Sequence, residues 1–203
     1  MKKLAILLVA TSALFTAATV SAQESPWLLR VRAVDITPDN KSSPISGSGA
    51  PDRISVSSKT IPELDISYFF SANWSTELIL TYPQKHDVYL DGSSIGSFKE
   101  LPPTLLAQYH FMPEADFSPY VGGGINYTRI SNVSLLNGSG SLQSHSFGPA
   151  VQAGVDYKLD KHWLLNFDIK KVQLRSNVYS GDTQISAVHI DPWLIGVGVG
   201  YRF

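Results

Sequence analysis

The sequence predicts an all-β protein, an eight-stranded antiparallel transmembrane β-barrel. Three observations predict it: segments of alternating apolar and polar residues, connections that are short and long in turn, and a final strand that ends on an aromatic residue. The composition agrees, because charged residues make up only 16% of the chain and the mean hydropathy is +0.01. A barrel with an apolar outside and a polar inside has such a balanced average.

Eight segments alternate with a period of two residues, which is the pattern of strands whose two faces meet different surroundings. In the second segment Leu64, Ile66 and Tyr68 share one face, and Glu63 and Asp65 share the other. We predict strands at residues 26–36, 60–71, 74–85, 99–111, 117–130, 145–158, 162–176 and 186–203.

The connections between these segments are short and long in turn. The short ones are residues 71–73, 112–116 and 159–161, and the long ones, rich in Gly, Ser, Asn and Asp, are 37–59, 86–98, 131–144 and 177–185. Transmembrane barrels have short periplasmic turns and long outer loops. The pattern therefore predicts that both ends of the barrel domain lie on the periplasmic side.

The start of the chain has the three parts of a secretory signal peptide: Lys2 and Lys3, an apolar run at 4–9, and small residues up to Ala22. We predict a signal peptide at 1–22 and one barrel domain at 23–203. The chain contains no cysteine, so no disulfide is expected. Its net charge of −1 becomes more negative without the two lysines, which argues against nucleic acid as a partner.

Alternation alone does not decide which face is inside, and a soluble lipocalin-like barrel would show it too. Aromatic residues beside the short turns favour the membrane, because they would form an interfacial girdle. This aromatic set is Trp27, Phe69, Phe70, Trp74, Tyr109, Phe111, Phe117, Tyr120, Tyr157, Trp163, Tyr201 and Phe203. Charges on the opposite face would be badly placed in lipid and are expected to pair inside a lumen. This charged set is Arg30, Arg32, Glu63, Asp65, Glu77, Asp156, Asp168 and Lys170.

Three runs resemble the OmpW family of outer-membrane proteins. They are residues 101–111 (LPPTLLAQYHF), 119–128 (PYVGGGINYT) and 191–203 (DPWLIGVGVGYRF). The resemblance implies an eight-stranded barrel that passes small hydrophobic molecules across the outer membrane of a Gram-negative bacterium. The ending, with Tyr201 and Phe203, also resembles the signal that the barrel assembly machinery reads.

The resemblance further implies a narrow apolar channel. Matching the Glu77-Leu78 run of the family makes Ile79 an inward, channel-lining position. Lys170 stands where some relatives carry an aromatic residue, which argues against a purely apolar constriction here. Gln108 and Asn126 are expected to line the same channel.

Charges near the periplasmic end are expected to plug the lower lumen rather than to bind solute. The interior of an eight-stranded barrel is only just wide enough to be filled by side chains, and buried charges there need partners. The predicted plug consists of Arg30, Glu63, Asp65, Glu77, Asp156 and Asp168. A charged floor would direct an apolar solute sideways into the bilayer.

Prolines near the outer ends of two neighbouring strands are candidates for a lateral portal. Pro83 ends one strand and Pro102 and Pro103 begin the next, and each proline removes a donor from the hydrogen-bond ladder. Two interpretations stay open: the prolines weaken the wall for solute exit, or they only blunt the strand ends.

Other motifs predict no catalytic, cofactor or metal site. Residues 122–124 are three glycines without the Lys-Ser/Thr of a phosphate loop, so small residues on a curved wall explain them better. The five histidines lack paired ligand spacing, and those near the outer loops, such as His86, are expected to be solvated. His145 and Ser146 could belong to a lipid hydrolase, but neighbours in a strand point to opposite faces.

The leading functional prediction is therefore a passive outer-membrane channel or binding barrel for small hydrophobic molecules. Its expected partners are outer-membrane lipids, apolar solutes and, during insertion, the barrel assembly machinery; the pattern sets no oligomeric state. The alternative is a sealed structural or receptor barrel whose loops contact phage or bacteriocin. A lipid hydrolase of the outer membrane is a third class.

Overall fold

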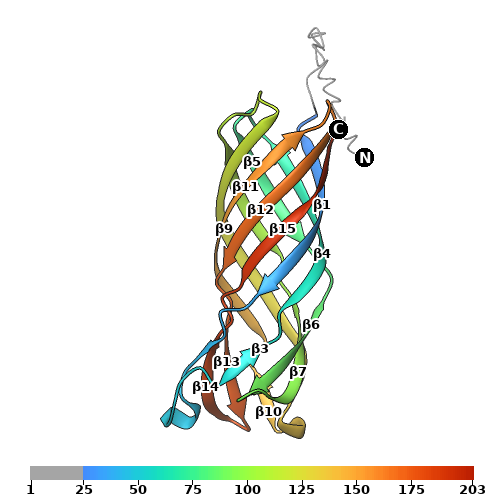
Figure 1. The fold of residues 1–203 in the computed structure, drawn as a ribbon. Coiled ribbons are helices and arrows are strands. Elements are labelled where there is room, and N and C mark those ends of the chain that lie inside the picture. Colours follow the sequence, from blue (N-terminus) through green and yellow to red (C-terminus); the bar gives the residue numbers. More distant parts are fainter. Residues whose placement is uncertain (1–24) are drawn as a thin grey trace, which may run out of the picture.

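The computed structural model describes residues 25–203 and shows a closed barrel with a second β-structure stacked on one end (Figure 1). The predicted signal peptide, residues 1–22, lies outside the described residues. Within residues 25–203, no helix has the length and apolar character needed to cross a bilayer.

Eight antiparallel strands form the barrel, as predicted. They are β1 (Trp27–Thr37), β4 (Lys59–Phe69), β5 (Trp74–Leu80), β8 (Thr104–His110), β9 (Phe117–Leu135), β11 (His145–Lys158), β12 (Trp163–Val172) and β15 (Trp193–Arg202). Each strand pairs with the next one around the barrel, and β1 closes the barrel on β15 with Val31 opposite Val199. Short turns connect the strands at the end where the chain terminates (Figure 1).

The predicted long loops at 86–98 and 177–185 are wrong, because both segments are β-hairpins. They form part of an extension beyond the barrel (Figure 1), together with the outer half of β9. Its strands are β2 (Lys41–Ser42), β3 (Ile54–Val56), β6 (Gln84–Leu90), β7 (Ser93–Leu101), β10 (Gly140–Leu142), β13 (Arg175–Ser180) and β14 (Thr183–His189), with single turns η1 (Ile45–Gly47) and η2 (Leu136–Gly138).

Two local signals account for the first of these hairpins, β6–β7. Asp91 and Gly92 both have positive φ, 49° and 79°, which is the backbone of the tight hairpin turn that Asp-Gly favours. Val88 and Phe98 point into the extension, so these polar-rich segments still have an apolar face to bury. The strand predicted to run to residue 85 stops instead at Leu80 and resumes as β6 beyond Pro83.

The predicted assignment of faces is confirmed. Along β1, Leu28, Arg30 and Arg32 point inward and are at most 1% exposed, whereas the outward Val31 is 51% exposed. The same alternation runs through the other barrel strands. The outer face is therefore an apolar belt and the inner face is polar toward the periplasmic end.

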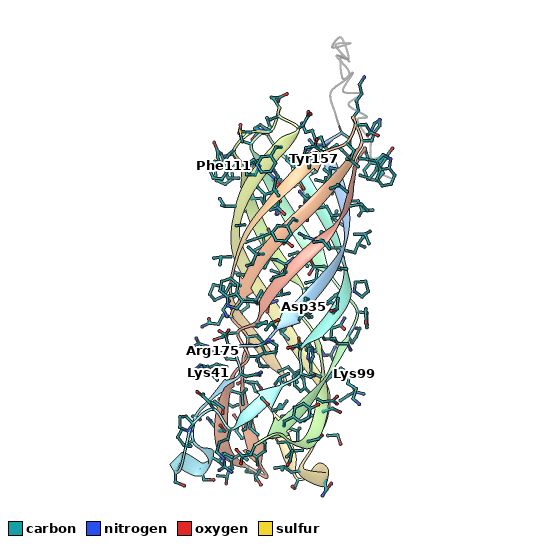
Figure 2. All side chains as sticks on the ribbon, in the orientation of Figure 1. Asp35, Lys41, Lys99, Phe111, Tyr157 and Arg175 are labelled. Atoms are coloured by element: carbon teal, nitrogen blue, oxygen red, sulfur yellow. The ribbon has the colours of Figure 1, made fainter. Side chains whose placement is uncertain are left out.

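An aromatic girdle surrounds the short-turn end. Rings meet edge to face across neighbouring strands, as in Trp27–Tyr68 at 4.9 Å and Trp163–Tyr201 at 5.0 Å between ring centroids. Figure 2 shows Phe111 and Tyr157 at this end. Tyr120, predicted for the girdle, lies instead in the lumen at 1% exposure, because it shares the inward face of β9.

Candidate functional site

The lumen contains three successive layers, and the inward residues of β1 run through two of them. Arg30 and Arg32 belong to a charged layer, and Val34 and Ile36 to an apolar layer farther from the periplasm. The remaining layer, which is the outermost, fills the extension. A solute that enters from outside therefore meets the extension layer and the layer of Val34 and Ile36 before it reaches the layer of Arg30 and Arg32.

The outermost layer is the extension core, which is apolar and almost closed. Phe98, Leu135 and Leu174 are at most 2% exposed within it. It surrounds a cavity of about 20 Å³, room for little more than one water molecule. The whole cluster is Ile54, Val56, Val88, Phe98, Ile130, Leu135, Leu174, Val178, Val188 and Ile190.

The second layer, the barrel cluster, lies inside the outer half of the barrel. It consists of Val34, Ile36, Ile61, Ile79, Leu106, Ala150, Val172 and Leu194. The predicted channel-lining residue Ile79 is one of them, at 3% exposure. Buried polar side chains also face inward between this cluster and the extension core, so the outer half of the lumen is mostly but not wholly apolar; they are Gln84, Glu100, Thr104, Asn126 and Thr128.

The third layer is the charge plug, and Arg32 lies at its centre. The guanidinium contacts four carboxylates: Asp65 at 2.6 Å, Asp168 at 2.8 Å, Glu77 at 3.2 Å and Glu63 at 3.3 Å. Sequence reasoning placed Arg32 on the inward face but did not include it in the plug. Its central role depends on four strands, β1, β4, β5 and β12, meeting across the lumen, which local patterns do not encode.

Arg30 forms the periplasmic side of the plug. It binds Glu77 at 3.0 Å and both oxygens of Asp156, at 3.1 and 2.5 Å. Tyr120 lies beneath its guanidinium, 5.4 Å from the ring centroid. Asn166 donates to both the Tyr120 hydroxyl and Asp156, so the layer is continuous across the barrel.

Lys170 forms the outer side of the plug instead of lining an open channel. Its Nζ lies 2.6 Å from Glu63 and 3.0 Å from Asp168, and its side chain is 2% exposed. The structure therefore brings together all six residues predicted for the plug and adds Arg32 and Lys170. Each charge in this set is buried beside an opposite charge, so the layer is a buried ionic floor of the lumen.

The other two predicted channel residues also belong to polar networks. Gln108 donates to Glu77 at 2.9 Å and to Gln152 at 2.8 Å, so it extends the plug. Asn126 donates to Thr104 at 2.8 Å beside the Pro102–Pro103 segment. Neither side chain borders open space, since both are at most 1% exposed.

A wide cavity of about 830 Å³ opens below the plug at the periplasmic end. Its wall is mixed: Asp156 and His110 face it from the plug side, and Lys158 and Arg202 from the rim. The plug thus separates this cavity from the barrel cluster in the outer half of the lumen.

The wall beside Pro83 lacks a continuous hydrogen-bond ladder. The β5–β8 ladder ends at Ile79 opposite Thr104, and the β6–β7 ladder begins only at Gln84 opposite Glu100. Residues 80–83 and 101–103 lie between these two ladders. The predicted break between the proline segments is therefore present.

A second break adjoins the first. The β4–β5 ladder ends at Leu64 opposite Leu80, and beyond it the Thr81 hydroxyl donates to the Pro62 carbonyl at 3.3 Å. Pro83 thus borders interrupted pairing on both sides. We name this stretch of wall, residues 60–63, 81–83 and 101–103, the seam; Ile61 and Ile79 of the barrel cluster lie just inside it.

The predicted assembly residues lie where the barrel closes. The Phe203 amide donates to the Trp27 carbonyl at 3.2 Å, and the Phe203 carbonyl accepts from Ser25 at 2.9 Å. Tyr201 packs edge to face on Phe203, 5.1 Å between ring centroids. The last strand is therefore held by β1 along its whole length.

The expectation of a solvated His86 is wrong, since this side chain is buried in the extension. It lies on the inward face of β6, with Nε2 3.4 Å from Glu100 and Nδ1 2.9 Å from the Ser57 carbonyl. Burial lowers its pKa, but Glu100 and the carbonyl outweigh this effect, so the pKa is raised above its usual value. His145 and Ser146, by contrast, point to opposite faces of β11, exposed and buried respectively.

The three glycines at 122–124 form part of β9 and no loop. A Cβ on Gly124 would lie 2.0 Å from the Leu105 carbonyl oxygen, whereas one on Gly123 would meet nothing within 4 Å. The neighbouring strand therefore requires Gly124, which supports the explanation of a tightly curved wall.

A closed barrel with an apolar belt, an aromatic girdle and a charged lumen floor defines an outer-membrane β-barrel protein. The OmpW family model matches residues 23–203, and the chain belongs to the OmpW family. The uncharacterized outer-membrane protein y4mB of Sinorhizobium fredii is 43% identical over 192 residues, 91% of this chain and 82% of that protein. The protein is thus placed in the outer membrane of a Gram-negative bacterium.

Two further similarities extend this result. The crystal structure of the outer membrane protein OprG from Pseudomonas aeruginosa has a TM-score of 0.77 and 30% identity, covering 89% of this chain and 97% of that one. The dibenzothiophene metabolism operon protein PahQ of Pseudomonas aeruginosa is 26% identical over 191 residues, 90% of each protein.

Proposed function

We propose that this barrel passes small hydrophobic molecules inward through its apolar outer lumen and releases them sideways through the seam into the bilayer. The observation that carries the proposal is the order of the layers: two apolar clusters lie outside a buried ionic floor, and the inner cluster is directly beside an interrupted wall. The activity is passive, without catalysis or cofactor. The expected partners are apolar solutes and outer-membrane lipids.

The charge plug opposes a straight route through the barrel. An apolar solute would have to separate ion pairs that have lost their water, and breaking one such buried pair costs about 3–5 kcal/mol. Moving from the barrel cluster into lipid tails exchanges one apolar environment for another, so it costs little. The lateral route therefore has the lower barrier.

The relatives agree with an apolar solute. PahQ carries the name of an operon for dibenzothiophene metabolism, and dibenzothiophene is a small, almost purely apolar aromatic molecule. The cavity of the extension core, at about 20 Å³, is smaller than any such solute. Passage therefore requires the apolar side chains of the extension to move apart.

A pair of cross-links across the seam tests the lateral route in the cysteine-free chain. Pro62→Cys with Tyr82→Cys bridges the β4 side, and Tyr82→Cys with Pro102→Cys bridges the β8 side. Uptake of radiolabelled naphthalene by cells producing each oxidised variant should fall and should recover on addition of reductant. Leu64→Cys with Leu80→Cys is the matched control, because these residues are directly opposite in an intact ladder.

The outcomes separate the two routes. Undiminished uptake in both oxidised seam variants, together with loss of uptake in Ile79→Trp, would show that solute passes straight through the barrel. Equal loss in the Leu64–Leu80 control would mean that any stiffening of the wall stops transport, and the seam would have no special role.

The closed extension core favours one alternative function, a sealed barrel that serves as a receptor for phage or bacteriocin. Exchange of the two hairpins, residues 84–101 and 175–189, with those of a relative would then abolish phage or toxin sensitivity. Naphthalene uptake in the same cells would not depend on the presence of the barrel.

A further inference from the structure

Three basic side chains form an exposed patch on the outer wall just beyond the seam. Lys85 on β6 and Lys99 on β7 are directly opposite each other in the ladder. Arg129 on β9 is opposite Leu101, two residue pairs from Lys99, and all three side chains are exposed. Diagonal neighbours of this kind are about 7–8 Å apart, within reach of long side chains.

The patch has little internal compensation. Among residues 25–203, the only salt bridge made by these three residues joins Lys85 to Asp87, at 3.8 Å between exposed groups. Like charges directly opposite in a ladder destabilise it. Two lysines facing each other beside an arginine therefore form a site that an anion would stabilise.

The position of the patch along the barrel points to a lipid. Arg129 follows Tyr127 by two residues on the same outward face of β9, about 7 Å along the strand. Tyr127 is 48% exposed, and Tyr82, close to Lys85 in the chain, is 49% exposed, as rings at a membrane interface are. Figure 2 shows Lys99 in the half of the molecule away from Phe111 and Tyr157, short of the far tip.

The outer wall on the periplasmic side of the patch could accommodate the acyl chains of such a lipid. Leu105 and Ile125 are directly opposite each other on β8 and β9, and both are 47% exposed. Leu105 lies on the same outward side of the chain as Lys99, and Ile125 lies on the same outward face of β9 as Arg129. Cations at the headgroup level above an apolar column match a lipid that carries phosphate on its polar head.

We propose that Lys85, Lys99 and Arg129 bind the phosphate groups of an outer-leaflet glycolipid, whose chains lie on Tyr127, Ile125 and Leu105. Arg129 presents a guanidinium fork to phosphate oxygens, and the two lysines add point charges on either side. The bound anion removes the repulsion between Lys85 and Lys99.

Native mass spectrometry of the detergent-solubilised protein with bisphosphorylated lipid A tests the proposal. The variant Lys85→Gln/Lys99→Gln/Arg129→Gln should bind about 100-fold more weakly, because each cation at a membrane surface contributes about 1 kcal/mol to lipid binding. Heat-modifiable migration on gels shows that each variant is folded. Charge-conserving exchange, Lys85→Arg with Lys99→Arg, should retain binding.

A triple variant with the same charge change elsewhere is the control: Lys41→Gln/Arg53→Gln/Lys161→Gln. It should bind lipid A like the wild type. Equal binding by the patch variant and the wild type would overturn the proposal, and so would equal binding of enzymatically dephosphorylated lipid A. Displacement of the lipid by an equal concentration of inorganic phosphate would show a site for free anions and would also overturn it.

Discussion

Replacing Arg32 with methionine should destabilise the barrel strongly. Three of the four carboxylates that Arg32 contacts keep another cation nearby, but the fourth does not. Glu77 keeps Arg30 at 3.0 Å, and Glu63 and Asp168 keep Lys170 at 2.6 and 3.0 Å. Asp65 loses its ion-pair partner, and within residues 25–203 its Oδ1 has no hydrogen-bond partner to compensate.

The expected loss of stability follows from Asp65, the one buried carboxylate left without an ion-pair partner. Leaving one buried charge uncompensated costs about 3–5 kcal/mol, so the free energy of unfolding of Arg32→Met should fall by about that amount. Urea unfolding in phospholipid vesicles, followed by tryptophan fluorescence and extrapolated linearly, measures the difference. Adding Asp65→Asn removes this unpaired charge, so the double variant should recover most of the lost free energy of unfolding.

Two results would refute this reasoning. A loss below about 1 kcal/mol for Arg32→Met, the range of exposed ion pairs, would mean that the plug is hydrated and not a dry floor. A double variant no more stable than the single one would mean that Asp65 is not the group left unpaired. Arg53→Met is the control, because its partner Asp91 is exposed, and its unfolding midpoint should match the wild type.

Three further predictions concern the wall, the closure and the extension. Gly124→Ala should greatly lower the yield of heat-modifiable barrel and Gly123→Ala should not, because only the first places a Cβ against a strand carbonyl; equal yields would show that the wall can relax. Phe203→Ala should reduce outer-membrane insertion, and an undiminished membrane fraction would contradict it. The NMR titration midpoint of His86 should exceed 6.5 and should drop in Glu100→Gln; the pair stabilises the extension below pH 6.5, and this contribution is lost as pH rises through the midpoint. An unshifted midpoint in the variant would exclude Glu100 as the cause.

The barrel itself could be predicted from residue patterns because its faces meet opposite solvents. Leu64 and Glu63 are neighbours in one strand, and a shift of one residue would expose the carboxylate to lipid. The same cost applies to every barrel strand, so the alternation in the sequence indicates which residues face the lumen and which face the lipid. The short turns and the terminal Phe203 then define which end is which.

The hairpins of the extension were harder to predict because their inward faces are built from few apolar residues among many polar ones. Asp91-Gly92 is a recognisable hairpin turn, and it was the available signal for β6 and β7. The burial of His86 follows once β6 is a strand, since it shares a face with Val88. Composition alone had indicated an ordinary loop.

The sequence by itself determined the number of barrel strands, their faces, the girdle apart from Tyr120, and the set of charges that must lie inside, because these depend on period and on the transfer of side chains between water and lipid. Only the tertiary structure decided that Arg32 joins four carboxylates, that Lys170 belongs to the floor, and that the β4–β5 ladder beside Pro83 is interrupted as well. These features depend on which strands stand across the lumen and where each ladder stops. Such relations join residues more than one hundred positions apart, as Lys170 and Glu63 show, and closure of the barrel brings them together.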